Sequence, residues 1–171
     1  MRIGLLSDSH GRTGLLRAAM AALATHDVEV LVHCGDIHSP GDVEVLGAAG
    51  TPAYLVAGNS DHQVDRLAEA AERCGVHFSP LLIDVPLRNE QYLAALHGHD
   101  LRLLKALVAA HRFPYICHGH THRTSDDRHG KVRVICPGAL HHPRRSKHPT
   151  AAVLDTHQDT VTFIDTTEDA D

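Results

Sequence analysis

The sequence predicts an α/β protein built as a four-layer α/β/β/α sandwich, in which two mixed β-sheets pack face to face and helices cover the outside. Strand-like and helix-like segments alternate in the first half of the chain, whereas the second half is richer in strands joined by short loops. The 171 residues, 43% of them hydrophobic, suit one domain with a full core. We therefore expect a single domain over residues 1–171, with a frayed acidic tail at 166–171.

In the first half, apolar periodicity together with glycines, prolines and capping residues predicts three strands that alternate with three helices. The strands are expected at 2–7, 28–34 and 54–57. The first helix has Leu16, Met20 and Leu23 on one face, the second begins at Ser39-Pro40 and is ended by Gly47 or Gly50, and the third is ended by Gly75. A serine before a proline is typical of an N-cap followed by the first helical position. A glycine after the last apolar position supplies the left-handed conformation that commonly ends a helix.

In the second half, the pattern predicts strands at 76–87, interrupted by Pro80 and Pro86, and at 91–96, then a helix capped by Asp100 and closed by Phe113-Pro114, then strands at 114–117, 132–136, 151–155 and 161–164. The first two of these strands follow each other closely, so we expect an antiparallel pair. The loops DRHGK and THQDT are expected to join later strands. We expect the early strands to form one sheet and the late strands the other.

Composition excludes several classes of function. The formal net charge is -5, and basic residues are scattered except at Arg144, Arg145 and Lys147, so nucleic-acid binding is not expected. No stretch approaches the roughly 18 apolar residues of a membrane helix, and the N-terminus lacks a secretory signal, which favours the cytoplasm. The four cysteines are far apart and form no C-x-x-C pair, so we expect reduced thiols and no zinc knuckle.

Histidine is the compositional anomaly, with 17 residues. Several fall in step with Asp and Asn at the predicted strand ends, in the order Asp8 and His10, Asp36, Asn59, His97, then His120 and His122. A single such residue is more often a turn, a cap or a surface group. Ligands of open α/β sheets, however, bind beyond the carboxyl ends of strands, where loops converge. The joint pattern, seven oxygen and nitrogen donors at five strand ends, predicts that these side chains converge on one ligand.

The order of these motifs, D-S-H, G-D, G-N, H-G-H and G-H-T-H, resembles the calcineurin-like metallophosphoesterase superfamily, and within it the small phosphodiesterases of the YfcE-like group. The resemblance covers residues 3 to about 140. It implies two divalent ions, Mn²⁺ first, with Ni²⁺, Fe²⁺ or Zn²⁺ as alternatives. The ligand sets carried over are Asp8, His10 and His122 for one ion, Asn59, His97 and His120 for the other, and Asp36 as the bridge.

The same resemblance implies a phosphodiesterase, with monoester activity left open, that hydrolyses a small phosphate ester by attack of a hydroxide held between two ions. Asn59 is expected to help neutralise charge on the phosphoryl oxygens. Gly119 is expected to let the chain bend so that His120 and His122 reach different ions, with His118 as a supporting residue. The resemblance also implies a homo-oligomer, a dimer or a tetramer.

Two departures from the family pattern concern the substrate. The chain reads G-N-S-D where the wider superfamily has G-N-H-E, so Ser60 replaces the histidine thought to protonate the leaving group, and His62 is a candidate general acid. The segment CPGALHHPRR keeps only part of a family motif. Arg144 is a candidate ligand for a substrate phosphate, with His141 or His142 at the entrance. The alternative interpretation is that this segment is a solvent-exposed basic loop without a role in substrate binding.

Two non-catalytic functions are also consistent with parts of the pattern. One is a scaffold of the same fold that binds partner proteins and has a degraded metal site; the seven intact ligand positions argue against it. The other is a histidine-rich metal buffer. Buffering tracts tend to be contiguous and of low complexity, whereas these donors are spread over five strand ends.

Overall fold

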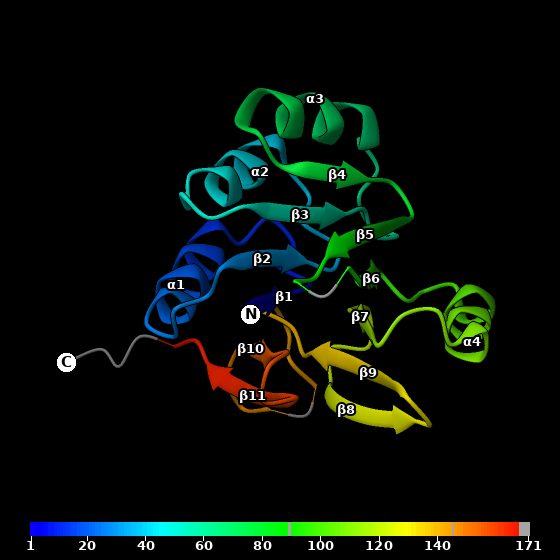
Figure 1. Ribbon diagram of the computed structural model, residues 1–171. Coiled ribbons are helices and arrows are strands. Elements are labelled where there is room, and N and C mark those ends of the chain that lie inside the picture. Colours follow the sequence, from blue (N-terminus) through cyan, green and yellow to red (C-terminus); the bar gives the residue numbers. More distant parts are fainter. Residues whose placement is uncertain (89, 145, 168–171) are drawn as a thin grey trace.

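The computed structural model describes residues 1–88, 90–144 and 146–167, and in it two β-sheets lie face to face between helices (Figure 1). Along the described chain the elements are β1 (Arg2–Leu6), α1 (Thr13–Ala24), β2 (Val30–His33), α2 (Pro40–Gly47), β3 (Ala53–Val56), α3 (Val64–Cys74), β4 (His77–Ser79), β5 (Leu82–Pro86), β6 (Tyr92–Leu96), α4 (Leu101–Ala110), β7 (Tyr115–His118), β8 (Thr124–His129), β9 (Val132–Pro137), β10 (Thr150–Asp155) and β11 (Thr160–Asp165).

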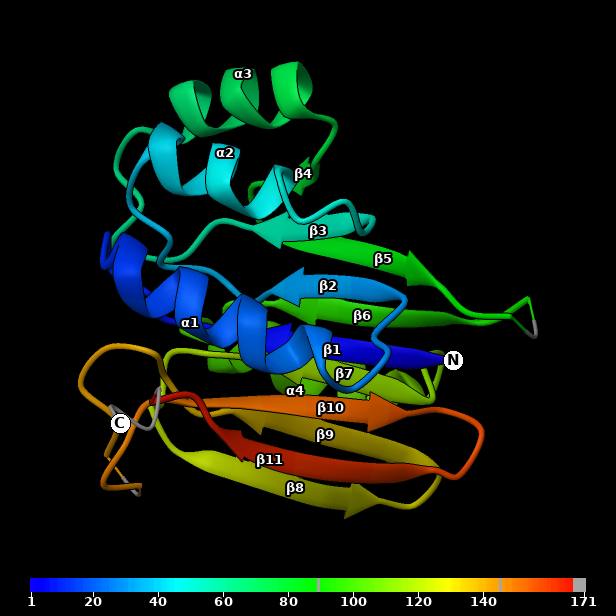
Figure 2. The ribbon, with the colours of Figure 1, turned by 90° about the vertical axis from the view of Figure 1, so that its left-hand side faces the viewer.

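Both sheets are mixed. The first has the strand order β11-β10-β1-β2-β3-β4, and the second has the order β5-β6-β7-β9-β8. In the first sheet β1 to β4 run parallel, whereas β10 and β11 are antiparallel to their neighbours. In the second sheet β6, β7 and β9 run parallel between antiparallel edges. Figure 2 shows the arrowheads of β2, β3 and β6 pointing the same way, so strand ends from both sheets meet at one end of the molecule.

Three apolar layers hold this arrangement together. Helices α1, α2 and α3 cover the outer face of the first sheet, with Leu16 and Leu67 among the buried contacts. Side chains such as Val32 and Leu93 fill the space between the sheets. Helix α4 covers the outer face of the second sheet, where Ile116 is buried. The four-layer sandwich is therefore the observed fold, because the central strands of each sheet are buried on both faces.

The alternation of side chains along a strand explains why these segments are apolar throughout. In β2, Leu31 packs toward the helices, whereas Val30 and Val32 pack between the sheets. Successive side chains point to opposite faces, and both faces are covered here. An uninterrupted apolar run is thus the pattern expected of a central strand, and only at its end can polar groups emerge.

Three predicted helix boundaries are confirmed, whereas α4 was predicted to close at Phe113-Pro114 and instead ends at Ala110, with His111 in the left-handed conformation. Ser39 accepts a hydrogen bond at Oγ from the Asp42 N–H, 3.2 Å away, with Pro40 at the first helical position of α2. Gly75 ends α3 with a φ of 72°, in the left-handed region. Asp100 caps α4 by accepting hydrogen bonds from the backbone of Arg102 and Leu103. Short-range chemistry thus determines where these helices start and stop.

The division into an early and a late sheet was wrong. The hairpin β10–β11 joins the first sheet, where β10 pairs antiparallel with β1, and β4 also belongs to that sheet as a parallel partner of β3. The chain crosses to the second sheet between β4 and β5, and the predicted antiparallel pair is β5 with β6. The loop DRHGK was also too long, because its first three residues belong to β8. That edge strand, TSDDRH, is polar and mostly exposed, so it lacks an apolar alternation.

The ends of the chain and the helix lengths bear on two further predictions. Thr166 is buried and its N–H donates to the Pro149 carbonyl, 3.0 Å away, so the start of the segment expected to fray is joined to the body. The remainder of that predicted tail, 168–171, lies outside the described residues. Within the part of the chain that the structure describes, no helix has the length and apolar character needed to cross a membrane.

Candidate metal centre

Five strand ends place the seven predicted ligand residues around one point. Asp8 and His10 follow β1, Asp36 follows β2, Asn59 follows β3, His97 follows β6, and His120 and His122 follow β7. The first three strands belong to one sheet and the last two to the other. The structure therefore brings together, from both sheets, donors as distant in the chain as Asp8 and His122.

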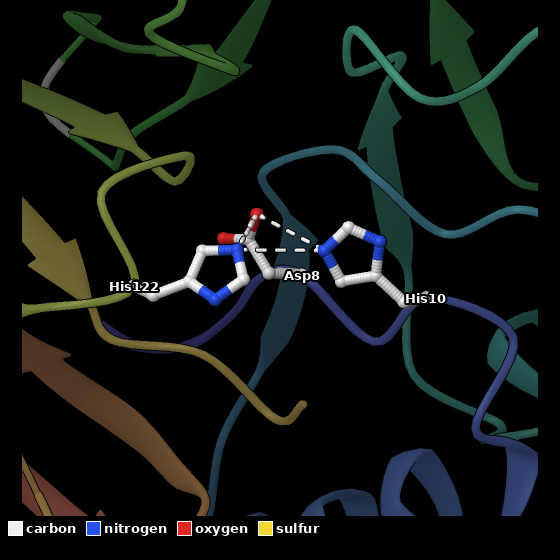
Figure 3. Close-up of side chains that lie close together, drawn as sticks. All are labelled: Asp8, His10 and His122. Carbon is white, nitrogen blue, oxygen red and sulfur yellow. Dashed lines mark hydrogen bonds and ion pairs between the residues drawn. The ribbon is translucent and has the colours of Figure 1, made fainter. Parts of the chain in front are cut away.

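Asp8, His10 and His122 form a first group, with the two imidazoles on either side of the carboxylate (Figure 3). Asp8 Oδ1 lies 3.2 Å from His122 Nε2 and 3.9 Å from His10 Nε2. The two Nε2 atoms are 3.4 Å apart. Each residue offers one donor atom, and these atoms lie within 4.8 Å of one another, which suits a shared cation.

Asp36 and His97 form a second group, and Asp8 also contributes to it. Asp36 Oδ2 lies 3.4 Å from His97 Nε2 and 3.6 Å from His10 Nε2, so this carboxylate stands between the two groups. Asn59 Oδ1 is 3.0 Å from the same His97 nitrogen. The participation of Asp8 in both groups was not predicted, because the sequence assigned it to one ion only.

His120 approaches this second group through its ring and its backbone. Its imidazole lies edge-on to that of His97, with ring centroids 5.2 Å apart. Its N–H donates to Asp8 Oδ2 over 3.0 Å. The backbone bond fixes the loop that carries His120 directly to the Asp8 carboxylate.

The donor set fits divalent cations on two observations. The Nδ1 atoms of His97 and His122 face backbone carbonyls, those of Cys34 at 2.8 Å and His142 at 2.9 Å, which leaves each Nε2 directed inward. Ligating histidines in proteins are commonly oriented in this way. In addition, the fully buried Asp8 Oδ1 has no well-aligned hydrogen-bond partner among the described residues. A buried carboxylate oxygen left in this state is a costly arrangement that a bound cation relieves.

The charges of the site are strongly coupled. Burial raises the pKa of Asp36, but hydrogen bonds from His97 and Ser60 outweigh it and bring that pKa well below its usual range. Burial lowers the pKa of His97, yet the hydrogen bond and charge of Asp36 raise it overall. The interaction with Asp8 likewise raises the pKa of His122. The carboxylates of Asp8 and Asp36 thus favour positive charge on the imidazoles beside them.

The backbone of the site is held in an uncommon conformation. Among the described non-glycine residues, eleven have positive φ, and seven of them belong to this region: Asp8, His10, Asp36, His38, His120, His122 and His142. A left-handed residue other than glycine costs about 1 kcal/mol or more. Such residues cluster at functional sites, where the surrounding structure holds them in place.

Gly119 supplies space rather than a bend. The predicted role of Gly119 as the bend was wrong, because the positive φ angles fall on His120 and His122. A Cβ on Gly119 would lie 1.8 Å from Ser7 Oγ and 2.8 Å from Asp8 Oδ2. The absence of a side chain therefore lets the loop after β7 pass directly over the Asp8 carboxylate.

An open cavity of about 500 Å³ lies over the centre and is lined by His10, Asp36, Asn59, Ser60, His120, His122, His141, His142 and Arg144. The segment that carries the last three is bound by its backbone to the ligand loops. The His141 N–H donates to the Asp8 carbonyl over 3.0 Å, and the Arg144 N–H donates to the His122 carbonyl over 2.8 Å. The predicted entrance residues and Arg144 thus face the space that a ligand would occupy.

His62 is not brought to this cavity. It lines a separate hollow together with residues 63–66 at the start of α3. The structure does not favour it as a general acid, although it is only two residues from Ser60. His118 is buried, with Nδ1 3.0 Å from the Gly119 carbonyl, in keeping with its expected supporting position.

Sequence reasoning missed the structural roles of three residues of the site. Ser60 donates from Oγ to Asp36 Oδ2 over 2.6 Å, and its N–H donates to Asp36 Oδ1 over 2.9 Å. The buried Asp61 carboxylate accepts hydrogen bonds from the loops after β2 and β3. His38 contacts His10. The spacing D-I-H at 36–38 repeats that of D-S-H at 8–10, and this repetition was a signal for His38.

Comparison with known proteins agrees with the geometry. The model of the calcineurin-like phosphoesterase superfamily domain matches residues 1–159. The chain is 25% identical over 159 residues to phosphodiesterase MJ0936 of Methanocaldococcus jannaschii, with 92% of this chain and 95% of the relative covered. It is 30% identical over 171 residues to the probable metallophosphoesterase YsnB of Bacillus subtilis, with 96% and 91% covered.

Solved structures show the same fold. A novel archaeal phosphodiesterase superimposes with a TM-score of 0.85 at 24% identity, covering 96% of this chain and 99% of the other. The Escherichia coli phosphoesterase YfcE superimposes with a TM-score of 0.68 at 20% identity, covering 98% and 100%. The resemblance seen in the motifs is confirmed, and this chain belongs to the calcineurin-like phosphoesterase superfamily.

Proposed function

We propose that the protein is a metal-dependent phosphodiesterase acting on a small phosphate ester at a dinuclear centre. Asp8, His10 and His122 would hold one divalent ion, Asn59, His97 and His120 the other, and Asp36 would bridge them. Mn²⁺ is the first expectation, with Ni²⁺, Fe²⁺ and Zn²⁺ as alternatives, because the donors mix oxygen and imidazole nitrogen.

The position of the Asp36 carboxylate carries this proposal. Its Oδ2 atom lies within 3.6 Å of a ring nitrogen from each ligand group, His10 in one and His97 in the other. A carboxylate in that position can belong to two coordination spheres at once. Paired ions of this kind would supply an activated water and Lewis-acid stabilisation of phosphoryl oxygens.

The chain itself contributes orientation and charge. Ser60 holds both oxygens of Asp36, which limits rotation of that carboxylate. The Asn59 amide and the Arg144 guanidinium both line the cavity, and we assign them to the phosphoryl oxygens of the substrate. Because His62 lies in a separate hollow, esters with good leaving groups should be hydrolysed best.

The direct test is hydrolysis of bis-p-nitrophenyl phosphate by chelated protein to which single metals are added back. We expect turnover that depends on the metal, and Asp36→Asn and His97→Ala should each lower kcat by on the order of 100-fold or more. Asp42→Asn is a matched control, because Asp42 is as deeply buried but contacts Thr13 and Ser39 outside the cavity. A parallel assay with p-nitrophenyl phosphate separates diester from monoester activity.

The opposite outcome is equally informative. Tight binding of metal without turnover on either ester would favour the scaffold or the metal buffer over the enzyme. A cytoplasmic location and a homo-oligomeric state, dimer or tetramer, stay predictions from the sequence. A panel of phosphorylated metabolites, screened with each metal, would identify the natural substrate class.

A further inference from the structure

The orientation of His10 differs from that of the other inward-facing histidines. His97 and His122 direct Nδ1 to backbone carbonyls, which are present whatever side chain the residue carries. His10 instead places Nδ1 3.3 Å from Nε2 of another side chain, His38. The two rings meet edge to face, with centroids 5.1 Å apart. The orientation of His10 therefore depends on a residue that can be changed without altering the backbone.

His38 is itself held in place by a buried carboxylate. Its N–H donates to Asp61 Oδ1 over 2.7 Å, and its φ of 83° lies in the left-handed region. The other oxygen of Asp61 accepts from Gly58 over 2.8 Å and from Ile37 over 3.3 Å. Asp61 is only 3% exposed, so these bonds are shielded from water. One carboxylate thus joins the loop that carries His38 to the loop that carries Asn59.

We propose that His38 is a positioning residue for the ligand His10, and that Asp61 fixes His38 while setting the spacing between the loops after β2 and β3. The inference rests on the proposed dinuclear centre and adds a residue, Asp61, that would help to position both ligand groups. Through His38 the carboxylate acts on the group that contains Asp8 and His122. Through Gly58 it acts on Asn59 in the other group.

The physical reason is the tautomer of an imidazole. A neutral histidine has one N–H and one lone pair, and only the nitrogen with the lone pair binds a metal. If His38 accepts at Nε2, then His10 carries its proton on Nδ1 and presents the lone pair of Nε2 toward Asp8 and Asp36. Without that acceptor, the proton is free to occupy Nε2 and the ring is free to turn. Loss of such an outer partner commonly costs about 10- to 100-fold in metal affinity.

The test measures Mn²⁺ binding to metal-free protein by titration calorimetry and by electron paramagnetic resonance. We expect His38→Ala to weaken one of two binding events by about 10- to 100-fold and to raise the signal of isolated Mn²⁺ relative to that of the coupled pair. His38→Gln, which restores an acceptor oxygen, should recover part of the affinity. His99→Ala is the matched control, because its ring also lies beside a ligand, 5.6 Å from that of His97.

A second variant separates positioning from stability. Asp61→Asn should weaken both binding events, because it disturbs both loops, whereas Asp42→Asn should lower thermal stability without changing the Mn²⁺ spectrum. The inference fails if His38→Ala binds two ions with the affinity and spectrum of the parent. If the parent itself shows no pair of bound ions, the proposed function fails instead, so the two results are distinguishable.

Discussion

Histidine side chains differ in this protein according to their burial and partners. His10 and His122, which line the cavity, lie beside carboxylates. His33, on β2, is instead completely buried on the helix side of the first sheet. Its Nε2 lies 3.1 Å from Ser9 Oγ, and its Nδ1 has no hydrogen-bond partner among the described residues. Burial lowers the pKa of His33 to about 4, although the charges of Asp61, Asp8 and Asp36 oppose the shift.

That lowered pKa predicts acid sensitivity in the metal-free protein. The unfolded chain takes up the His33 proton near its ordinary pKa of 6.5, whereas the folded chain does so near 4. The contribution of neutral His33 to the free energy of unfolding is therefore complete above about pH 6.5. As the pH falls toward 4, this contribution is lost, and the free energy of unfolding decreases by up to about 3 kcal/mol. Urea titrations of chelated protein at several pH values should show this fall, and His33→Gln should flatten it.

The exposed His157 provides the control, since His157→Gln should keep the slope of the parent. If His33→Gln and the parent lose stability equally between pH 6.5 and 4, burial of His33 is not the cause. The raised pKa values of His97 and His122 add stability to the chelated protein as the pH falls, so the contribution of His33 is taken from the difference between His33→Gln and the parent.

At the level of elements, the ends of strands and the starts of helices position the site. Helix α2 begins directly after Asp36 and His38, and its N-cap Ser39 makes two bonds with Asp42. Asp42 also accepts a hydrogen bond from Thr13, at the start of α1, over 2.6 Å. Asp42 therefore joins the first turns of α1 and α2.

Removal of this cap should be measurable as a loss of stability. Ser39→Ala leaves the Asp42 N–H without its side-chain acceptor and should lower the free energy of unfolding by about 1 kcal/mol. Ser39→Asn, which can also cap, should be close to the parent. Urea denaturation of the three proteins provides the comparison, and equal midpoints for Ser39→Ala and the parent would contradict the expected role of the cap.

On the scale of the whole molecule, the site connects the two sheets. The proposed ligands follow β1, β2 and β3 in the first sheet and β6 and β7 in the second, so the closely spaced donors lie where both sheets end. The unfolded chain does not hold these donors together. Binding of metal should therefore stabilise the folded state of the whole domain relative to the unfolded state.

Metal removal should accordingly lower the melting temperature. With free Mn²⁺ at about 100 times its dissociation constant, the stabilisation is about 2.7 kcal/mol, which corresponds to a rise in Tm of about 5 to 10 °C. Chelation should reverse this rise, and Asp36→Asn should lose most of it. A Tm that is insensitive to Mn²⁺ in the parent would count against a metal site formed by the folded protein.

Several features were predictable because their causes are local. The caps at Ser39 and Asp100 follow from the hydrogen bonds a side chain can make within its own turn. The polar strand ends were visible because apolar runs stop there. The edge strand β8 was not predicted, because its residues are polar and mostly exposed and so show no alternation of apolar side chains. Local patterns thus indicated which residues form most elements, and the family resemblance proposed the ligand sets.

The sequence by itself determined the α/β class, most of the strands and helices, and the donors that follow five strands, because backbone propensity and side-chain alternation act between near neighbours. Only the tertiary structure decided that β10 lies beside β1, that His62 lines a hollow separate from the cavity, and that Asp61 contacts His38 and His38 contacts His10. Those outcomes depend on packing and hydrogen bonds between segments that are distant in the chain. The free energies of such contacts cannot be inferred from a local sequence pattern.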